Sequence, residues 1–566
     1  MYSKKLIAPV LLLCFISSLE LSAAEPPPST DVAVTQKRIT EETRKKLEEE
    51  HKKIEIEKEP SKEEPSGPAE QQFFVRQVVL KGNESISIDI LEPFVTPYEG
   101  RDLTLTKANE LARKIESEYR YRGYIATLVF FPPQKVVDGT LTIQIVEGRM
   151  GKLYIEGNKW FSDSAIRRYW AIKENEVLRY EDVRRNAKRM GENPDRTVRV
   201  VLKAGEKPGY TDVYIKVEDH FPFHATFQFD NQGVRPTGKR RFDFVTRYNN
   251  WIIPDSILLA GTVFGKDFGA VFTQYIVPLT AHGTKLVSGF SHSQVAPKKE
   301  FKSLDINGIA QTYTVSLHQT LLDRERFLSN GWVGFDFKES TTRSTVGTRR
   351  RDRLRVLHSG FDFAYRDKWG ITAFENEISF GIKLFGASGE SNPLAGRAGA
   401  EPDFIKFEPK LTRSFSLPYD TQAIGKLSSQ LSPHKLTPQE EFFLGGATTV
   451  RGYPEGDFLG DQGILLNFEY LVPFRFLPKT WKVPHSDQPL WKETKFVFFY
   501  DLGYARLRGP ASTEIQKRFL SGIGAGIRIR LSKYLYGRVE FAHVLGQEPL
   551  TDSDHTRVHF SLQVQV

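Results

Sequence analysis

The chain has 566 residues and a mass of 64.6 kDa, and 39% of its residues are hydrophobic. This length can hold several domains, each large enough for a core, and it excludes a single small module. Lysine and arginine number 79 against 70 for aspartate and glutamate, which gives a net charge of +9. The basic excess is spread thinly along the chain, so nucleic acid is not expected as a partner.

The hydropathy of the chain argues against an α-helical membrane protein. Its mean hydropathy is −0.39, and after the N-terminal segment no apolar run approaches the roughly 18 to 20 residues that a spanning helix needs. A β-barrel escapes this test, because only every second residue of its strands faces lipid. The 41 phenylalanines and 21 tyrosines fit a barrel, which is polar on average and rich in aromatic residues.

The N-terminus has the pattern of a cleaved secretory signal. Lys4 and Lys5 precede an apolar stretch over residues 6–19, and a triplet of small residues ends at Ala24, after which cleavage is expected. The only cysteine, Cys14, lies inside the signal. The mature chain then has no thiol, which excludes disulfides, thiolate metal sites and a cysteine nucleophile. We therefore expect export to a bacterial envelope.

Residues 25–72, after this signal peptide of residues 1–24, form a polar segment with prolines near both ends. Its middle, from Gln36 to Glu59, places a glutamate four residues before a lysine four times, an arrangement that stabilises a helix. We predict a solitary polar helix between flexible tethers. A solvated spacer explains the same composition and remains the alternative.

Residues 73–149 are predicted to form a compact α+β unit. Residues 73–81 are strand-like and end at the turn signal Gly82-Asn83. A helix capped by Thr106 follows, with its apolar residues on one stripe. The two remaining strands are predicted over residues 124–130 and 141–147.

A second unit of similar size follows over residues 150–220. A strand again leads into a Gly-Asn pair, Gly157-Asn158, and is followed by helices and then strands. The predicted elements are a strand at 152–156, helices at 162–169 and 180–190, and strands at 197–202 and 212–218. An internal repeat of this length favours tandem small domains over one large core.

Residues 221–566 alternate between polar and apolar residues. The pattern starts around residues 223–230, returns at 333–338 and 361–365, and ends at 558–566. The span holds about 16 strands of 9 to 11 residues with their turns. A soluble sandwich rarely needs so many uniform strands, and a propeller would show a blade-length repeat, which the sequence lacks. The predicted fold is a transmembrane β-barrel.

A glycine-rich segment over residues 442–464 interrupts this alternation and is predicted to be a long loop. It contains Val450, Arg451, Gly452 and Tyr453. Residues 495–503 then alternate strictly, which places Phe499, Asp501 and Gly503 on the lumen side of a strand. A loop folded into the lumen would let Arg451 bind Asp501 through two hydrogen bonds. Water is the alternative partner of Asp501, and spacing alone does not separate the two.

Three alternating glycines, Gly522, Gly524 and Gly526, lie on one face of a predicted strand. They leave a lane along which another backbone can approach, which supports a loop in the lumen. The same letters resemble a dinucleotide-binding loop, but no helix follows and residues 528–531 continue the strand.

With these residues the chain resembles the outer-membrane transporters of two-partner secretion (TpsB type), which export haemolysins and filamentous adhesins and belong to the POTRA-plus-barrel superfamily. Residues 450–453, Val-Arg-Gly-Tyr, match the loop-tip motif of that family, and residues 499–503 match its FxDxG strand. The two α+β units resemble its two POTRA domains, through pairs such as Gly123-Tyr124 and Asn193-Pro194.

The resemblance implies a 16-stranded antiparallel barrel in the outer membrane, preceded by POTRA 1 (73–149) and POTRA 2 (150–220) in the periplasm. Its sixth extracellular loop would fold into the lumen, with Arg451 bonded to Asp501. The polar helix between Gln36 and Glu59 would occupy the pore at rest.

The resemblance also implies a function. The POTRA domains would recognise an unfolded partner protein, a large β-helical adhesin or haemolysin, and the barrel would pass it to the cell surface without ATP. No cofactor and no metal are expected. Outer-membrane lipid and the barrel assembly machinery are the other expected partners, and the chain is expected to be a monomer.

Two other functions fit less well. A membrane-protein insertase of the same superfamily usually carries more POTRA domains than the two predicted here. A barrel hydrolase would need a serine, a histidine and an acid on one face, and none of the 12 histidines falls in such a motif. The protein is therefore not expected to be an enzyme.

Overall fold

The computed structural model describes residues 55–58 and 72–566, except residues 135, 137, 346–348, 390, 391, 485, 513, 533 and 551. The expected signal peptide and most of the polar segment thus lie outside the described residues. The chain divides into two compact units, one of which comprises Phe223–Leu279 and Gly283–Val566. Among the described helices, none is long and apolar enough to cross a membrane.

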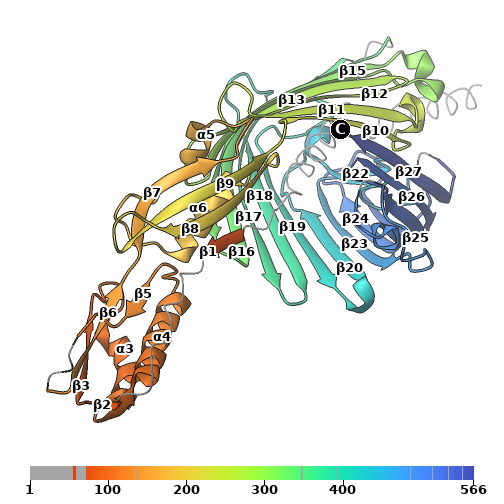
Figure 1. Cartoon of the computed structure of the whole chain (residues 1–566). Helices are drawn as coiled ribbons and strands as arrows, with labels where there is room; N and C mark the ends of the chain where they lie inside the picture. Colours follow the sequence, from red (N-terminus) through yellow and green to blue (C-terminus); the bar gives the residue numbers. More distant parts are fainter. Residues whose placement is uncertain are drawn as a thin grey trace, which may run out of the picture. The chain divides into compact units, whose positions relative to one another are not determined.

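The first α+β domain packs two helices against a small sheet (Figure 1). In this sheet β6 is paired with β3 in parallel and with β5 in antiparallel, and β2 and β4 form a separate pair. Its elements are β2 (Gln72–Val75), β3 (Gln77–Lys81), α3 (Ile88–Val95), η2 (Thr96–Tyr98), β4 (Arg101–Thr104), α4 (Leu105–Tyr121), β5 (Leu128–Phe130) and β6 (Thr140–Val146). The core joins Leu91 of α3 and Leu111 of α4 to Ile143 of β6.

The helix predicted here begins slightly earlier than expected. Thr104, not Thr106, is the N-cap of α4, and its side chain accepts a hydrogen bond from the backbone N–H of Lys107 (3.3 Å). The predicted apolar stripe is buried. The sequence did not predict α3, because this helix is short and contains Pro93.

The second domain is a four-stranded sheet in the order β1-β8-β9-β7 with two helices. Its elements are β1 (Glu55–Lys58), β7 (Arg149–Glu156), α5 (Asp163–Arg167), α6 (Tyr180–Met190), β8 (Arg196–Ala204) and β9 (Tyr210–Asp219). Met150, Val183 and Ile215 are among the buried residues that join the helices to the sheet. Apart from β1, these elements follow the predicted order.

Strand β1 corrects the predicted extent of the polar helix. Glu55–Lys58 pair in parallel with β8, from Glu55 opposite Arg199 to Lys58 opposite Leu202, so a helix cannot run to Glu59. Exposed charge pairs at i,i+4 stabilise a helix by only about 0.2–0.5 kcal/mol each. The edge of β8 offers a row of backbone groups that need partners, which favours a strand there. The rest of the predicted helix lies outside the described residues.

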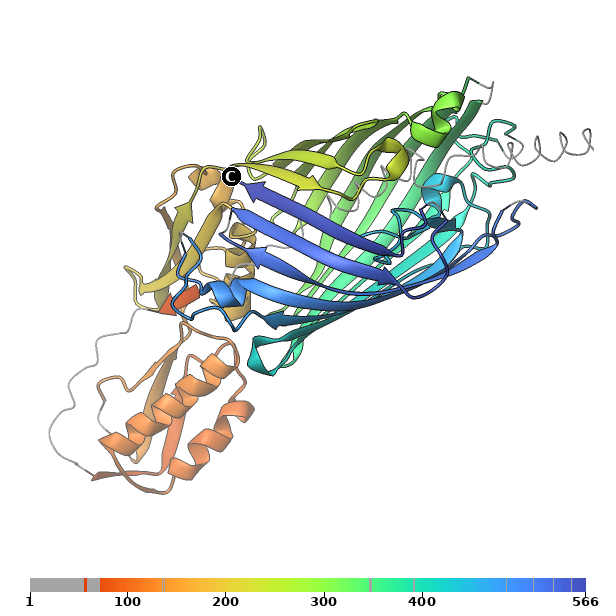
Figure 2. The same ribbon diagram turned by 90° about the vertical axis from the view of Figure 1, so that its right-hand side faces the viewer.

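Sixteen antiparallel strands close into a barrel, which confirms the predicted fold class. They are β10 (Phe223–Asp230), β11 (Arg241–Asn249), β12 (Ile257–Gly265), β13 (Phe268–Pro278), β14 (Thr284–Val295), β15 (Asn307–Asp323), β16 (Phe327–Arg343), β17 (Arg349–Asp367), β18 (Gly370–Gly381), β19 (Ile405–Ser416), β20 (Gln422–Gln430), β23 (Gln462–Pro473), β24 (Thr494–Arg506), β25 (Lys517–Arg530), β26 (Leu535–Val544) and β27 (Thr556–Gln565). Figure 2 shows the last strand lying beside the first.

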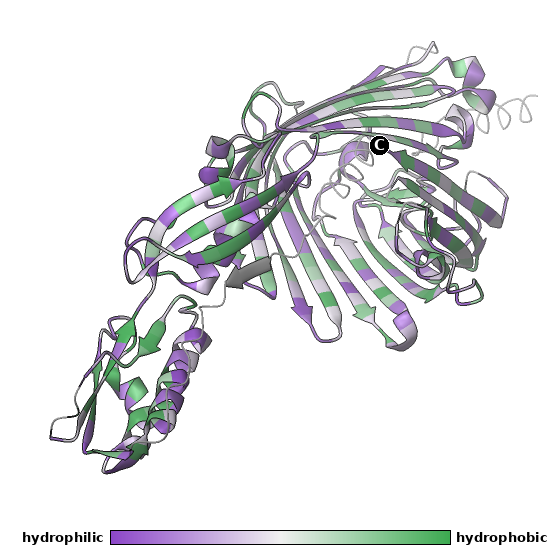
Figure 3. Cartoon of the chain, in the orientation of Figure 1, coloured by the Kyte–Doolittle hydropathy of each residue, from purple (hydrophilic) through white to green (hydrophobic). Residues whose placement is uncertain are grey.

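The barrel wall has an apolar outer face and a more polar inner face. Figure 3 shows hydrophobic and hydrophilic residues alternating along the strands. In β24 the side chains of Phe498 and Tyr500 are exposed on the outside, whereas Val497, Phe499 and Asp501 are buried on the lumen side. This is the predicted alternation, and it follows from the two-residue period of a strand.

One long loop connects two neighbouring strands of the barrel and contains a hairpin of its own. Loop 431–461, between β20 and β23, is the sixth connection at the end opposite the first residue of β10. It begins eleven residues before the predicted loop 442–464 and ends at 461, because residues 462–464 belong to β23. It holds the hairpin β21 (Phe442–Leu444) and β22 (Phe458–Gly460). The short helices of the barrel unit are η3 (Arg235–Thr237), η4 (Lys299–Leu304), η5 (Pro418–Asp420), η6 (Pro438–Glu440) and α7 (Leu490–Glu493).

Candidate functional site

Loop 431–461 folds back into the barrel. Four of its residues belong to one buried apolar cluster with residues of the inner wall: Leu444, Val450, Tyr453 and Phe458 from the loop, and Leu465, Ala505, Leu507, Leu520 and Val544 from β23 to β26 and their connections. Buried apolar area of this size stabilises a fixed position, because each fully buried side chain contributes about 1.5–3 kcal/mol. The loop therefore has one packed position in the lumen.

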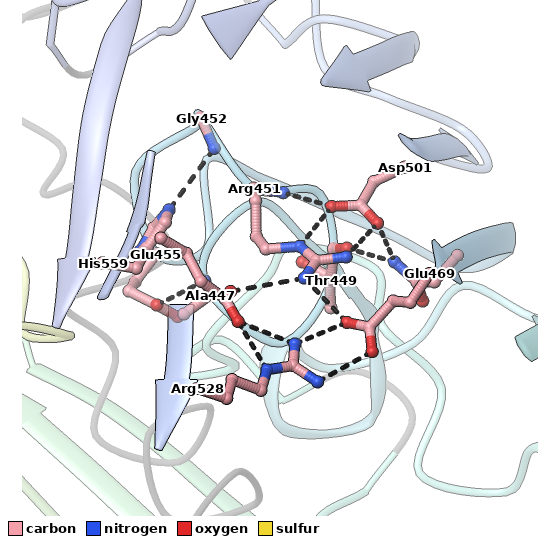
Figure 4. A network of polar contacts seen from close by, with 11 residues as sticks. Ala447, Thr449, Arg451, Gly452, Glu455, Glu469, Asp501, Arg528 and His559 are labelled. Atoms are coloured by element: carbon pink, nitrogen blue, oxygen red, sulfur yellow. Dashed lines mark hydrogen bonds and ion pairs between the residues drawn. The ribbon is translucent and has the colours of Figure 1, made fainter. Parts of the chain in front are cut away.

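The tip of the loop is fastened to the wall by an arginine and an aspartate. Arg451 donates from Nε to Asp501 Oδ2 (2.7 Å) and from Nη2 to Asp501 Oδ1 (2.8 Å). Its backbone N–H also donates to Oδ2 (3.1 Å). Asp501 is fully buried and is held further by Asn467 (2.8 Å), which also donates to the carbonyl of Thr449 (Figure 4). The predicted contact between Arg451 and Asp501 is present.

Two further carboxylates surround the same guanidinium. Arg451 Nη1 donates to Glu469 of β23 (2.7 Å) and to Glu540 of β26 (3.3 Å). The guanidinium carbon lies 3.6 Å from the centre of the Phe499 ring, close enough for a cation–π contact. The guanidinium group of Arg451 thus packs against the ring of Phe499, the phenylalanine of the 499–503 motif.

A second arginine connects these acids. Arg528 of β25 donates to both carboxylate oxygens of Glu469 (2.9 and 2.8 Å) and to Glu540 (2.8 Å). Two arginines therefore share three buried carboxylates, and Figure 4 shows the resulting chain of contacts. Removing either arginine would leave three buried carboxylates beside a single guanidinium group, and breaking a buried ion pair in this way typically costs about 3–5 kcal/mol.

The remaining residues of the two motifs hold the loop in place by close packing, backbone conformation or hydrogen bonds. A Cβ on Gly503 would lie 2.8 Å from side-chain atoms of Leu444 and Val450, so only glycine lets the loop lie against β24. Gly452 has φ +99°, a conformation that disfavours other residues, and its N–H donates to His559 (3.4 Å). Tyr453 is fully buried and donates to the carbonyl of Gln547 (2.7 Å).

The three alternating glycines meet different neighbours. A Cβ on Gly522 would lie 2.1 Å from the carbonyl oxygen of Arg451, so this glycine does receive the loop backbone. A Cβ on Gly524 would meet the Phe541 carbonyl (2.0 Å) and the Phe499 ring (2.3 Å). A Cβ on Gly526 would meet the carbonyl of Val539 and atoms of Glu540. Only Gly522 lies directly against the loop, and Gly524 gives room to the ring beneath Arg451.

The stem of the loop is fastened separately at its first acidic residue. Glu440 accepts from Lys338 of β16 and from Lys406 of β19, each at 2.8 Å. Lys406 also lies 2.8 Å from Glu408. Lys338 and Lys406 project inward from strands that are distant from β24 in the barrel order. The stem and the tip therefore contact different parts of the wall.

A second stem contact closes the base of the loop. Arg397, from the connection between β18 and β19, donates to Glu441 (2.7 Å) and to Asp461 (2.8 Å), the residues beside the two ends of the inner hairpin. Asp461 also accepts from the backbone N–H groups of Leu436 and Arg508, both at 2.6 Å. Burial raises the pKa of Glu441 to about 8, against the pull of Arg397 and together with the charge of Asp461.

The sequence pointed to Arg451 and Asp501 but missed several of their partners. Glu469, Glu540 and Arg528 lie on three different strands, and they meet because the barrel register sets Glu469 opposite Phe499 and Glu540 opposite Gly526. The alternation of each strand places these three residues on the lumen side. Many other residues share that position, so alternation alone does not single them out. In the part of the chain that the structure describes, no group of three or more His, Cys, Asp or Glu has a metal-binding arrangement.

Two family models match the chain. The model of the POTRA domain, ShlB-type, matches residues 73–148. The model of the haemolysin secretion/activation protein ShlB/FhaC/HecB matches residues 209–529, more than half of the chain. The chain belongs to this family.

Relatives and solved structures agree. The chain is 26% identical over 377 residues to the outer membrane transporter CdiB of Dickeya dadantii, covering 65% of this chain and 66% of that protein. It is 22% identical over 401 residues to the heme/hemopexin transporter protein HuxB of Haemophilus influenzae, covering 70% and 71%. The structure of CdiB from Escherichia coli has the same fold, with a TM-score of 0.71 at 18% identity, over 94% of this chain and 98% of that chain.

Proposed function

We propose that this protein is the outer-membrane pore of a two-partner secretion system, which exports an unfolded partner protein from the periplasm to the cell surface. Family membership and the closed barrel of 16 strands support this function. The barrel lies in the outer membrane, and its POTRA domains lie in the periplasm. The partner is proposed to be a large β-helical adhesin or haemolysin.

The observation that carries the mechanism is the loop tip locked against the lumen wall. Arg451 makes three hydrogen bonds to Asp501 in a buried site, so the loop tip is held inside the lumen in this state. Passage of a chain then requires the loop to leave this position or to shift within it. The contacts at stem and tip define one resting arrangement, and the passing chain supplies interactions that replace them.

Docking of the partner is proposed to use the POTRA sheets. An extended chain can add a strand to an exposed sheet edge through backbone hydrogen bonds. In the first domain β5 ends the sheet, and its Leu128 and Phe130 are 43% and 44% exposed. In the second domain β1 already pairs with β8. The edge of β5 with its two apolar side chains is therefore the proposed first contact for an unfolded chain.

The finer parts of the proposal follow from the same features. We place the domain boundaries at 73–149, 150–220 and 221–566 and the residues of the secretion motif at Val450, Arg451, Gly452, Tyr453, Phe499, Asp501 and Gly503. The pore is proposed to act as a monomer, to be inserted by the barrel assembly machinery, and to have no enzymatic activity, cofactor or metal.

An insertase of the same superfamily is the second candidate. The structure of BamA from Haemophilus ducreyi shares the fold, with a TM-score of 0.53 at 13% identity. Its likeness extends to the fold alone, whereas the family model that matches this chain is that of secretion proteins. Secretion is therefore favoured.

The test is reconstituted secretion. The protein is co-expressed in turn with each large β-helical exported protein of the same genome, and the surface-exposed partner is measured by protease accessibility on intact cells. We expect export with the wild-type pore and strongly reduced export with Arg451→Ala or Asp501→Ala, because each removes the buried ion pair that holds the loop tip against β24. Heat-modifiable gel migration verifies that the barrels are inserted. Absence of export by the wild type would contradict the function, and full export by either variant would contradict the role of the lock.

A further inference from the structure

An arginine-rich patch lies on the outer face of the barrel at its extracellular end. In β16 and β17 the residues at odd positions face outward, since Val333, Phe337, Leu357 and Phe361 are exposed while their even neighbours Trp332 and Val356 are buried. At the extracellular end this outward set is Glu339, Thr341, Arg343, Arg349, Arg351, Arg353 and Arg355. Five outward positions are therefore arginines, against a single carboxylate.

The patch begins where the apolar band ends. On β16 the outward residues run from Phe327 to Phe337, and the ten residue steps between them rise about 33 Å along the strand and about 25 Å along a tilted barrel axis. This height equals the usual apolar band of an outer-membrane barrel. Glu339 and Arg343 follow directly. The arginines thus stand at the level of the lipid headgroups of the outer leaflet.

The base of the patch is built by protein contacts. Arg355 is buried, donates to the carbonyl of Phe385 (3.0 Å) and to Glu339 (3.3 Å), and lies over the Phe337 ring (5.0 Å). Arg351 lies 3.5 Å from the same Glu339. One carboxylate is therefore shared by two guanidinium groups, and it cannot neutralise the rest of the patch.

Two features of the patch remain unfavourable within the protein itself. Arg343 and Arg349 are directly opposite in the register of β16 and β17, and like charges at opposite positions destabilise a sheet. The Nε of Arg351 is buried without a hydrogen-bond partner among the described residues. An anion placed between the two strands would relieve both. Guanidinium groups bind phosphate oxygens in pairs, with charge-assisted hydrogen bonds.

We propose that this patch, formed by Arg343, Arg349, Arg351 and Arg353, binds the phosphate groups of an anionic lipid of the outer leaflet. The apolar band below it, with Phe337 and the exposed Phe385 that lies against it, receives the acyl chains. The bound lipid fixes the barrel on the side of β16 and β17. The inference depends on the barrel lying in the outer membrane and is independent of whether any partner is exported.

The experiment measures binding of lipid A to the purified full-length protein in non-ionic detergent. Bisphosphorylated lipid A is titrated, and phosphate-free lipid A and inorganic phosphate serve as separate probes. An arginine near a charged lipid surface contributes about fivefold in affinity, so Arg343→Gln/Arg349→Gln/Arg351→Gln should weaken binding about 100-fold. The matched control, Arg324→Gln/Arg326→Gln/Arg366→Gln, removes three exposed arginines at the periplasmic end and should bind like the wild type.

Two more variants separate charge from structure. The triple lysine variant of the same three positions keeps the charge and should retain most of the affinity, and the single Arg349→Gln should lose about fivefold. Gel migration before and after heating checks that each barrel is folded. Unchanged binding by the triple glutamine variant, an equal loss in the periplasmic control, equal binding of phosphate-free lipid A, or equal binding of free phosphate would each overturn the proposal.

Discussion

At the scale of single residues, the loop motif is a set of close contacts that tolerate little change. Arg451 needs its planar guanidinium because it addresses Asp501 and Glu469 at once while lying on the Phe499 ring. Gly503 and Gly522 have no Cβ atom, and a Cβ at either position would keep the loop away from β24 or β25. The motif residues therefore act together, since each one makes room for or holds another.

Gly522→Ala should displace the loop tip. The new Cβ would lie 2.1 Å from the Arg451 carbonyl oxygen, so the backbone of the loop must move, and overpacking of this kind costs about 1–3 kcal/mol. We expect loop 431–461 to become cleavable by added protease at a lower temperature than in the wild type. Gly425→Ala on β20 is the control, because no other atom would lie within 4 Å of the added Cβ. It should leave the cleavage temperature unchanged. Equal cleavage temperatures for all three proteins would contradict the steric role.

At the scale of elements, loop 431–461 is held at two separate places. Its tip contacts β23 to β26, and its stem contacts β16, β19 and the connection between β18 and β19. A loop fastened at one place only could swing about that contact. Two distant fastenings instead define one orientation, so both must change when the loop moves.

The stem should be sensitive to pH through Glu441. Burial raises the pKa of Glu441 from 4.5 to about 8, so the folded loop binds more protons than the unfolded one between these values. Its stability then falls as pH rises through this window, and the loss is complete above pH 8. We expect protease cleavage of loop 431–461 to accelerate between about pH 5 and about pH 8.

Glu441→Gln tests this dependence because it is neutral at every pH. Cleavage of this variant should vary much less over the same range. Asp487→Asn, which changes an exposed carboxyl group on the periplasmic connection between β23 and β24, is the control and should keep the wild-type slope. An identical slope in Glu441→Gln would show that another group is responsible.

At the scale of the whole molecule, a closed barrel holds one of its own loops against its inner wall. The closing pair, β10 with β27, has five register pairs, from Thr226 opposite Gln565 to Asp230 opposite Ser561, whereas β16 and β17 share seventeen. The wall is thus longest at β15 to β17, on the side that carries the arginine patch. The N-terminal polar segment is the predicted plug of the lumen.

Deleting residues 30–53 should raise the ion conductance of the purified pore in a planar bilayer. This deletion removes most of the predicted plug helix and leaves β1 (Glu55–Lys58) paired with β8. Because β1 begins at Glu55, the predicted helix can extend only from Gln36 to residue 54 in the undeleted chain. A helix of this length would reach about 28 Å, which is still close to the thickness of the hydrocarbon layer. Deletion of residues 61–66, which follow β1 in the sequence and lie outside the predicted plug helix, should leave the conductance unchanged. Unchanged conductance in both variants would reject the plug.

Much of the fold could be predicted because its cause is local. A strand that faces lipid on one side and the lumen on the other must alternate, and the alternation of residues 495–503 is enough to place Asp501 on the lumen side. The apolar stripe of α4 is likewise a local pattern. The cap of that helix, two residues away from the predicted one, depends on which threonine has an extended backbone, and both threonines fit the sequence.

The sequence by itself determined the periodicity of each element, and from this the barrel and the two small domains follow. It also determined that Asp501, the predicted partner of Arg451, lies on the lumen side of the wall. Only the tertiary structure decided which acids those are, that residues 55–58 join the edge of β8, and that Arg343 lies opposite Arg349. The physical reason is range. Alternation is imposed on neighbouring residues by the strand itself, whereas these contacts depend on strand register and free sheet edges, which join residues far apart in the chain.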